Sequence, residues 1–212
     1  MSEVLKMKNT SGRKLYSLGE FYKIYHLTFF SANDLRYAKK NELLNEQFIE
    51  RIMLAVTEVN GCSYCSYAHT KMALEAGMSN EDIQNMLSGV NDDVPEEEIS
   101  AIMFSQHYAE TRGRPSKKSW ERIVEIYGIK EAKGILGAIR IMMFGNAAGV
   151  AWGSFVSRLK KEAKVDERSD LFYEMGMILA TIVYLPIALV HTLLAKLVRT
   201  PAIKFNDADD EQ

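Results

Sequence analysis

Residues 50–69 read ERIMLAVTEVNGCSYCSYAH, and this stretch decides the fold class. Apolar residues before Asn60 recur with the spacing of an α-helix. The Asn60-Gly61 step is a helix stop signal, after which a second helix can begin at once. That second helix would carry Cys62 and end at Gly77, a residue type suited to a helix C-terminus. The stretch therefore predicts two consecutive helices joined by a tight turn.

The same helical spacing extends over most of the chain, whereas alternating strand patterns are nearly absent. Residues 89–98 form an acidic linker that contains Pro95. The sequence therefore predicts an all-α protein, with one large domain or a core domain and a substantial appendage. Helices are expected near residues 15–30, 41–59, 62–76, 79–88, 99–108, 120–127 and 130–161. Ser79, with Asp82 three residues later, is expected to cap the helix at 79–88, and Gly128 is expected to break the helical pattern.

The composition is that of a globular protein. Of the 212 residues, 47% are hydrophobic and 25% are charged, which is enough apolar material for a sizeable core. The formal net charge of −2 and the absence of a basic patch argue against a nucleic-acid partner. The first residues contain no apolar segment of a secretory signal, and two cysteines are too few for a secreted disulfide scaffold. A cytoplasmic location is expected.

Cys62 and Cys65 are the only two cysteines, and their spacing places them on one face of the second helix. His69 follows Cys65 by one helical turn. Because Gly61 precedes the pair, both thiols fall in the first turn, where the helix dipole favours a thiolate. A nearby histidine can accept the thiol proton, and a second cysteine can resolve a sulfenic acid. The pattern indicates a redox site.

The acidic partner of His69 is less certain from the residues alone. Glu50 lies off the middle of the apolar stripe of its helix, so geometry alone favours a solvated surface carboxylate. Glu58 is nearer to the turn and is the rival candidate to orient His69.

The spacing Glu50-x11-Cys62-x2-Cys65-x3-His69 resembles the core motif of the alkylhydroperoxidase D-like (AhpD-like) proteins in the carboxymuconolactone decarboxylase superfamily. The resemblance covers roughly residues 35–108. It implies that Cys65 is the attacking thiolate, Cys62 the resolving thiol and His69 the proton acceptor, with Glu50 orienting His69.

The same resemblance implies the activity and the partners. The expected activity is reduction of organic hydroperoxides or disulfide exchange, without a cofactor, with a lipoyl-bearing or thioredoxin-like dithiol as the reductant. A homo-oligomer is also implied. The peroxidase branch of the family carries a histidine between the cysteines, where this chain has Tyr64, which weakens the expectation of peroxide chemistry. Lactone decarboxylases of the superfamily lack the redox pair, which argues against decarboxylation.

The resemblance and the helical pattern together divide the chain into four regions. An N-terminal helical lead-in would span residues 1–30, followed by an AhpD-like redox core at 31–115. Additional C-terminal helices would occupy 116–205, and the acidic tail at 206–212 is expected to be disordered.

Two features leave other classes of protein open. A zinc site could use both cysteines and His69, with His107 or Glu50 as the fourth ligand. Structural zinc sites usually have a second close ligand pair, which the sequence lacks, so no metal is expected. Residues 175–195 carry no charge and approach the length of a membrane span. Pro186 within that segment favours instead a buried, kinked helix at an oligomer interface.

Small residues also recur with a spacing of four at Gly145, Gly149 and Gly153. This spacing places them on one face of a helix, where they predict the close approach of another helix. The glycine face and the apolar segment at 175–195 both favour a homo-oligomer.

Overall fold

The computed structural model describes residues 14–162 and 166–206, and within these ranges it consists of seven helices without a strand. The predicted all-α class is confirmed. The predictions for residues 1–13 and 207–212 lie outside the described residues. The helices are α1 (Leu18–Lys40), α2 (Glu46–Asn60), α3 (Ser63–Glu75), α4 (Asn80–Leu87), α5 (Glu96–Glu110), α6 (Lys117–Leu159) and α7 (Leu171–Leu197).

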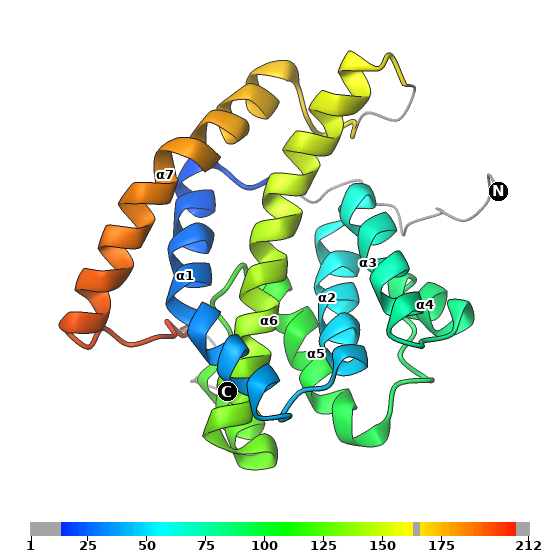
Figure 1. Ribbon diagram of the computed structural model, residues 1–212, viewed down its shortest axis with the longest axis vertical. Coiled ribbons are helices and arrows are strands. Elements are labelled where there is room, and N and C mark those ends of the chain that lie inside the picture. Colours follow the sequence, from blue (N-terminus) through cyan, green and yellow to red (C-terminus); the bar gives the residue numbers. More distant parts are fainter. Residues whose placement is uncertain (1–13, 163–165, 207–212) are drawn as a thin grey trace.

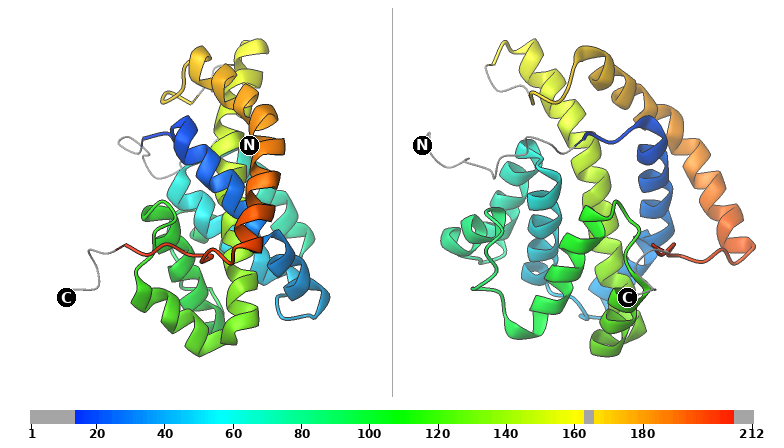
Figure 2. Two further views of the ribbon diagram at one scale, coloured as in Figure 1. Left: turned by 90° about the vertical axis from the view of Figure 1, so that its left-hand side faces the viewer. Right: turned by 180° about the vertical axis from the view of Figure 1, so that it is seen from behind.

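The long helix α6 runs through the middle of the molecule (Figure 1). Helices α1 and α7 pack on one side of α6, and α2 and α3 pack on the other side. Helix α5 contacts both α2 and α6, and α4 closes the outer end against α2 and α3. The views in Figure 2 show α7 along one outer edge of the molecule, far from α4. The core lies between α6 and the helices on its two sides.

The helix boundaries follow from capping residues. Helix α2 begins at Glu46 rather than at residue 41, because the Asn45 side chain accepts the Phe48 N–H at 2.8 Å and so starts the helix. It ends at Gly61, whose φ of 67° is left-handed. Ser79 caps α4 as predicted, accepting the Asp82 N–H. The expected break at Gly128 appears as a kink inside α6, where φ is 73°.

A single buried cation connects three parts of the chain to α6. Arg140 is buried, and its guanidinium donates to Tyr108 Oη of α5 at 2.9 Å and to Ser31 Oγ of α1 at 2.6 Å. It also donates to the backbone oxygen of Ala202, beyond the end of α7, at 2.5 Å. Each of the three guanidinium nitrogens therefore donates to a neutral oxygen, and these hydrogen bonds lower the cost of burying the charge.

Helix α7 is largely exposed in the single chain. It is long and apolar enough to cross a membrane, as is α6, but the most apolar window of α6 is 78% buried whereas that of α7 is only 22% buried. Within the chain, α1 and α6 cover only part of α7, so its burial at an oligomer interface stays a prediction. The part covered by α1 is held by polar contacts: Tyr25 donates to Thr181 O at 3.1 Å, and His26 Nδ1 lies 2.9 Å from Thr192 Oγ1.

Candidate functional site

The two cysteines meet at the first turn of α3 and are joined by a disulfide, with 5.3 Å between their Cα atoms. Cys62 is the N-terminal capping residue, and its Sγ accepts the Cys65 N–H at 3.2 Å. Ser66 Oγ donates to the Cys62 carbonyl at 3.0 Å. Cys62 is fully buried, whereas 6% of Cys65 is exposed to solvent. Cys65 is therefore the more exposed of the two cysteines.

Glu50, which precedes this turn in the chain, and His69, which follows it, form a hydrogen-bonded pair. His69 Nδ1, on α3, lies 2.8 Å from Glu50 Oε2, on α2. Since the carboxylate only accepts, Nδ1 carries the proton and Nε2 is the acceptor nitrogen of the neutral ring. The contact joins α2 and α3, the two helices that were predicted from the sequence of residues 50–69. The hydrogen bond to His69 thus comes from Glu50, the candidate that the motif spacing favoured over Glu58.

The interpretation of Glu50 as a solvated carboxylate is wrong, because only 3% of Glu50 is exposed. That interpretation assumed that α2 buries one stripe. In the structure α2 is enclosed by α3, α4, α5 and α6, so residues 48–50 and 52–59 are all buried. A carboxylate in this position needs a partner, and His69 supplies one.

The glycine face of α6 receives the cysteine turn. A Cβ atom on Gly149 would lie 2.5 Å from Cys65 Sγ and 3.1 Å from Cys62 Sγ. A Cβ atom on Gly153 would lie 3.0 Å from Tyr64 Cβ, and the Gly145 carbonyl oxygen is 3.4 Å from Cys65 Sγ. The spacing of four predicted a close approach, and the approaching element is α3 of the same chain. This face therefore no longer supports an oligomer interface.

Aromatic side chains surround the turn on its outer side. Tyr64 and Tyr67 of α3 and Trp152 of α6 are each at least half exposed. Tyr64 occupies the place of the family's histidine and packs its Cβ toward Gly153. The disulfide is thus covered by α6, and the half-exposed Tyr64 packs against the same glycine face.

Arg168 contacts the cysteine turn, and the sequence analysis did not predict this contact. Its Nη2 donates to the Gly61 carbonyl at 2.9 Å, directly before Cys62, and its guanidinium pairs with Asp166 at 2.6 Å. Burial opposes the charged carboxylate, but the hydrogen bonds and charge of Arg168 outweigh it and lower the pKa of Asp166. The contact joins residues far apart in the chain, so no local pattern could have revealed it.

The ligand set of the zinc alternative does not assemble. His107 Nε2 accepts the Ser116 N–H at 3.2 Å and caps the turn before α6. Within residues 14–162 and 166–206, no three His, Cys, Asp or Glu side chains are grouped so that they could hold a metal ion. His107 therefore has a structural contact of its own.

These features define a class of helical proteins in which a Cys-x-x-Cys pair opens a helix, and a histidine one turn later pairs with a buried glutamate of the preceding helix. Residues 29–94 match the model of the carboxymuconolactone decarboxylase family. The matched region includes α2, α3 and the whole motif from Glu50 to His69. The resemblance seen in the sequence is thereby confirmed. No curated protein and no solved structure matches the chain significantly.

Proposed function

We propose that the protein is a thiol-dependent oxidoreductase that cycles between the Cys62–Cys65 dithiol and disulfide. The observation that carries this proposal is the disulfide in the first turn of α3, one helical turn before a histidine paired with a buried glutamate. The family match supports redox chemistry of the AhpD-like kind. The preferred substrate class is an organic hydroperoxide, and a disulfide is the second candidate.

In the first step the Cys65 thiolate attacks the terminal oxygen of the hydroperoxide. An S–O bond forms and the O–O bond breaks, so Cys65 becomes a sulfenic acid and the substrate leaves as an alcohol. The greater exposure of Cys65 supports its role as the attacking thiol. His69 accepts the thiol proton through Nε2, and Glu50 holds the ring in the tautomer that makes this possible.

In the second step Cys62 attacks the sulfenic sulfur of Cys65. The S–S bond forms, the S–O bond breaks and water leaves. The two Cα atoms are within the range that a disulfide requires, so resolution needs no rearrangement of α3. An external dithiol then reduces the disulfide by exchange and becomes oxidised itself. A lipoyl-bearing or thioredoxin-like protein in the cytoplasm would suit this role.

A specific observation favours disulfide exchange as the second candidate. Tyr64 replaces the histidine of the peroxidase branch and lies with Cys65 against Gly149, while Tyr64, Tyr67 and Trp152 present exposed aromatic surface on α3 and α6. Exposed tyrosine and tryptophan are the residue types that protein interfaces favour. The same surface would dock the protein that reduces the disulfide or the protein whose disulfide is exchanged.

The test treats the reduced, chelated protein with stoichiometric cumene hydroperoxide and follows free thiols and the Cys62–Cys65 peptide. Cys65→Ser removes the attacking sulfur, and Glu50→Gln removes the charge behind His69. Glu58→Gln is the matched control, because Glu58 is a buried glutamate of the same helix. The proposal predicts rapid disulfide formation that is lost in Cys65→Ser and slowed by a factor of about 100 in Glu50→Gln.

Two other outcomes have defined meanings. Slow reaction with peroxide but fast reaction with a small disulfide would select the second candidate. If the reduced protein formed no Cys62–Cys65 disulfide with any oxidant, the redox proposal would be overturned.

A further inference from the structure

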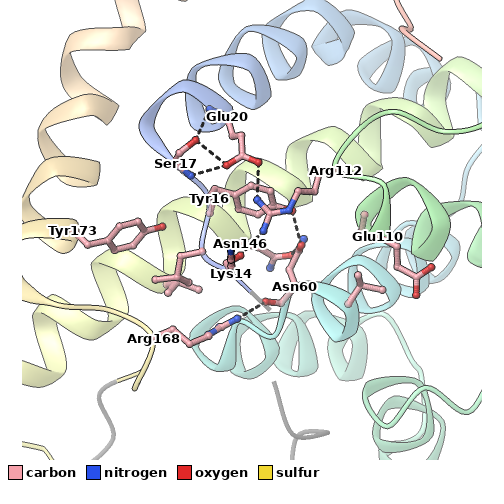
Figure 3. A pocket seen from close by; sticks show the side chains of 15 residues that line it. Lys14, Tyr16, Ser17, Glu20, Asn60, Glu110, Arg112, Asn146, Arg168 and Tyr173 are labelled. Atoms are coloured by element: carbon pink, nitrogen blue, oxygen red, sulfur yellow. Dashed lines mark hydrogen bonds and ion pairs between the residues drawn. The ribbon is translucent and has the colours of Figure 1, made fainter. Parts of the chain in front are cut away.

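A cavity of about 830 Å³ lies beside Asn60, at the end of α2 (Figure 3). Residues from α1, α2, α5, α6 and α7 line it, together with the segment that leads into α1. Its volume falls within the range of about 300 to 1,000 Å³ that is usual for small-molecule sites. Neither cysteine lines this cavity, so it is separate from the proposed redox chemistry.

One polar group in the wall lacks a partner. The hydroxyl of Tyr173 is buried and has no hydrogen-bond partner among the described residues. Figure 3 shows the ring entering from the start of α7 with its hydroxyl directed into the cavity. The position is fixed, because the Tyr173 N–H donates to the capping Asp170 at 2.8 Å. Buried hydroxyls in proteins are normally paired, so this one points to an acceptor supplied by a ligand.

The two arginines of the wall are paired with carboxylates, and Lys14 and Glu110 add one charge of each sign to the wall. Arg112 pairs with Glu20 at 2.7 Å, and Arg168 pairs with Asp166 at 2.6 Å. Burial raises the pKa of Tyr173 to about 12, so its hydroxyl stays protonated and acts as a neutral donor. An anionic ligand would have to compete with these carboxylates for the two arginines. The geometry therefore favours an uncharged acceptor.

The rest of the wall is suited to an apolar body. Leu15, Val59, Ala147 and Val150 contribute aliphatic surface, and the ring of Tyr16 adds an aromatic face. The ring of Tyr16 is fixed, because its hydroxyl donates to Asn60 Oδ1 at 2.7 Å. The wall thus combines an aliphatic and aromatic part with polar and charged side chains, and sites for small organic molecules combine both kinds of surface.

We propose that this cavity binds an uncharged small organic molecule whose carbonyl oxygen accepts a hydrogen bond from Tyr173. The apolar part of the ligand packs against the aliphatic wall. Asn60 and Arg168 belong to the same wall, and Arg168 donates to the Gly61 carbonyl before Cys62. The ligand site thus shares the Asn60-Gly61 turn with the redox pair without exposing the sulfurs.

The test compares three probes of similar shape by calorimetry and by thermal unfolding: benzophenone, diphenylmethane and 4-benzoylbenzoate. Benzophenone should bind best, since diphenylmethane lacks the acceptor and 4-benzoylbenzoate carries a charge. Tyr173→Phe should weaken benzophenone about tenfold and leave diphenylmethane unchanged, because it removes one hydrogen bond. Tyr37→Phe, an exposed tyrosine of α1 that does not line the cavity, is the matched control.

The unliganded variant supplies a second readout. Removing an unpaired buried hydroxyl should make Tyr173→Phe at least as stable as the wild type without ligand, and only the wild type should gain stability from benzophenone over diphenylmethane. A less stable unliganded Tyr173→Phe would mean that the hydroxyl already has a partner. That result, tighter binding of 4-benzoylbenzoate, or equal affinities of the wild type and Tyr173→Phe for benzophenone would each overturn the proposal.

Discussion

Gly149 and Cys65 are in direct contact, so close that a Cβ atom on residue 149 would lie 2.5 Å from the Cys65 sulfur. The contact joins the middle of α6 to the first turn of α3. Because the neighbouring atoms are the two sulfurs of a constrained turn, they cannot move aside as the end of a flexible side chain would. The residue type at position 149 therefore controls where the redox pair can lie.

Gly149→Ala is accordingly expected to push α3 away from α6. Overpacking of this kind costs about 1–3 kcal/mol of unfolding free energy, which urea denaturation measures. Gly145→Ala is the matched control, since its Cβ would lie 3.5 Å from Met142 Cε, an ordinary contact. The control should be neutral or gain up to about 1 kcal/mol from helix propensity. Equal effects of the two substitutions would contradict this account.

Substitution of Tyr64 by histidine tests what limits peroxide chemistry. Tyr64→His restores the residue that the peroxidase branch has between its cysteines, and it should accelerate disulfide formation with cumene hydroperoxide by about tenfold or more. Tyr67→His changes another exposed tyrosine of α3 outside the motif and should have little effect. Rates would be followed by loss of free thiol. An unchanged rate in Tyr64→His would show that the relay through His69 is already sufficient.

The exposed face of α7 is expected to be an interface between copies of the chain. Apolar residues such as Ile182 and Leu193 are exposed there, while the other face of α7 is held to α1 by polar contacts and is not free to meet lipid. The purified protein should therefore sediment as an oligomer without detergent. Ile182→Asp with Leu193→Asp should weaken the assembly about a hundredfold.

The control for this experiment is Leu159→Asp, at an exposed leucine of α6. It should leave the sedimentation of the protein unchanged. A protein that is monomeric in buffer would contradict the expected interface. A protein that stays soluble only in detergent would instead support a membrane-associated α7.

Acid should destabilise the contact between α1 and α7. Burial, followed by the nearby charge of His191, lowers the pKa of His26 below its ordinary value of 6.5, and Arg140 adds to this effect. Since the unfolded chain then binds more protons, stability is complete above pH 6.5 and falls as the pH drops toward the lower pKa of the folded state. Urea denaturation on either side of pH 6.5 should show this loss. It should be smaller in His26→Asn, and an unaltered pH dependence would assign the loss to other groups.

The ends of several helices could be predicted from the sequence, because helix capping and chain reversal depend on a few adjacent residues. The Asn60-Gly61 stop, the Ser79 cap and the break at Gly128 all occur as predicted. The start of α2 was misplaced because two asparagines, at positions 41 and 45, could each precede the helix, and only Asn45 caps it.

Burial was harder to predict, because it depends on how many neighbours a helix acquires. Glu50 was predicted to be solvated on the assumption that α2 has one buried face, but four helices surround α2. The apolar segment of α7 was predicted to be buried at an oligomer interface, and within the chain α1 and α6 leave most of it exposed. The motif spacing brought Glu50 and His69 together correctly, whereas the Arg168 contact required the tertiary fold.

The contacts of Arg140 have a consequence for the order of events during synthesis. One acceptor of this buried guanidinium is the carbonyl of Ala202, which is translated long after the helices of the core. Until that carbonyl arrives, α6 carries an incompletely satisfied charge at its centre. The surroundings of Arg140 are therefore complete only after Ala202 has been made and has folded back against α6.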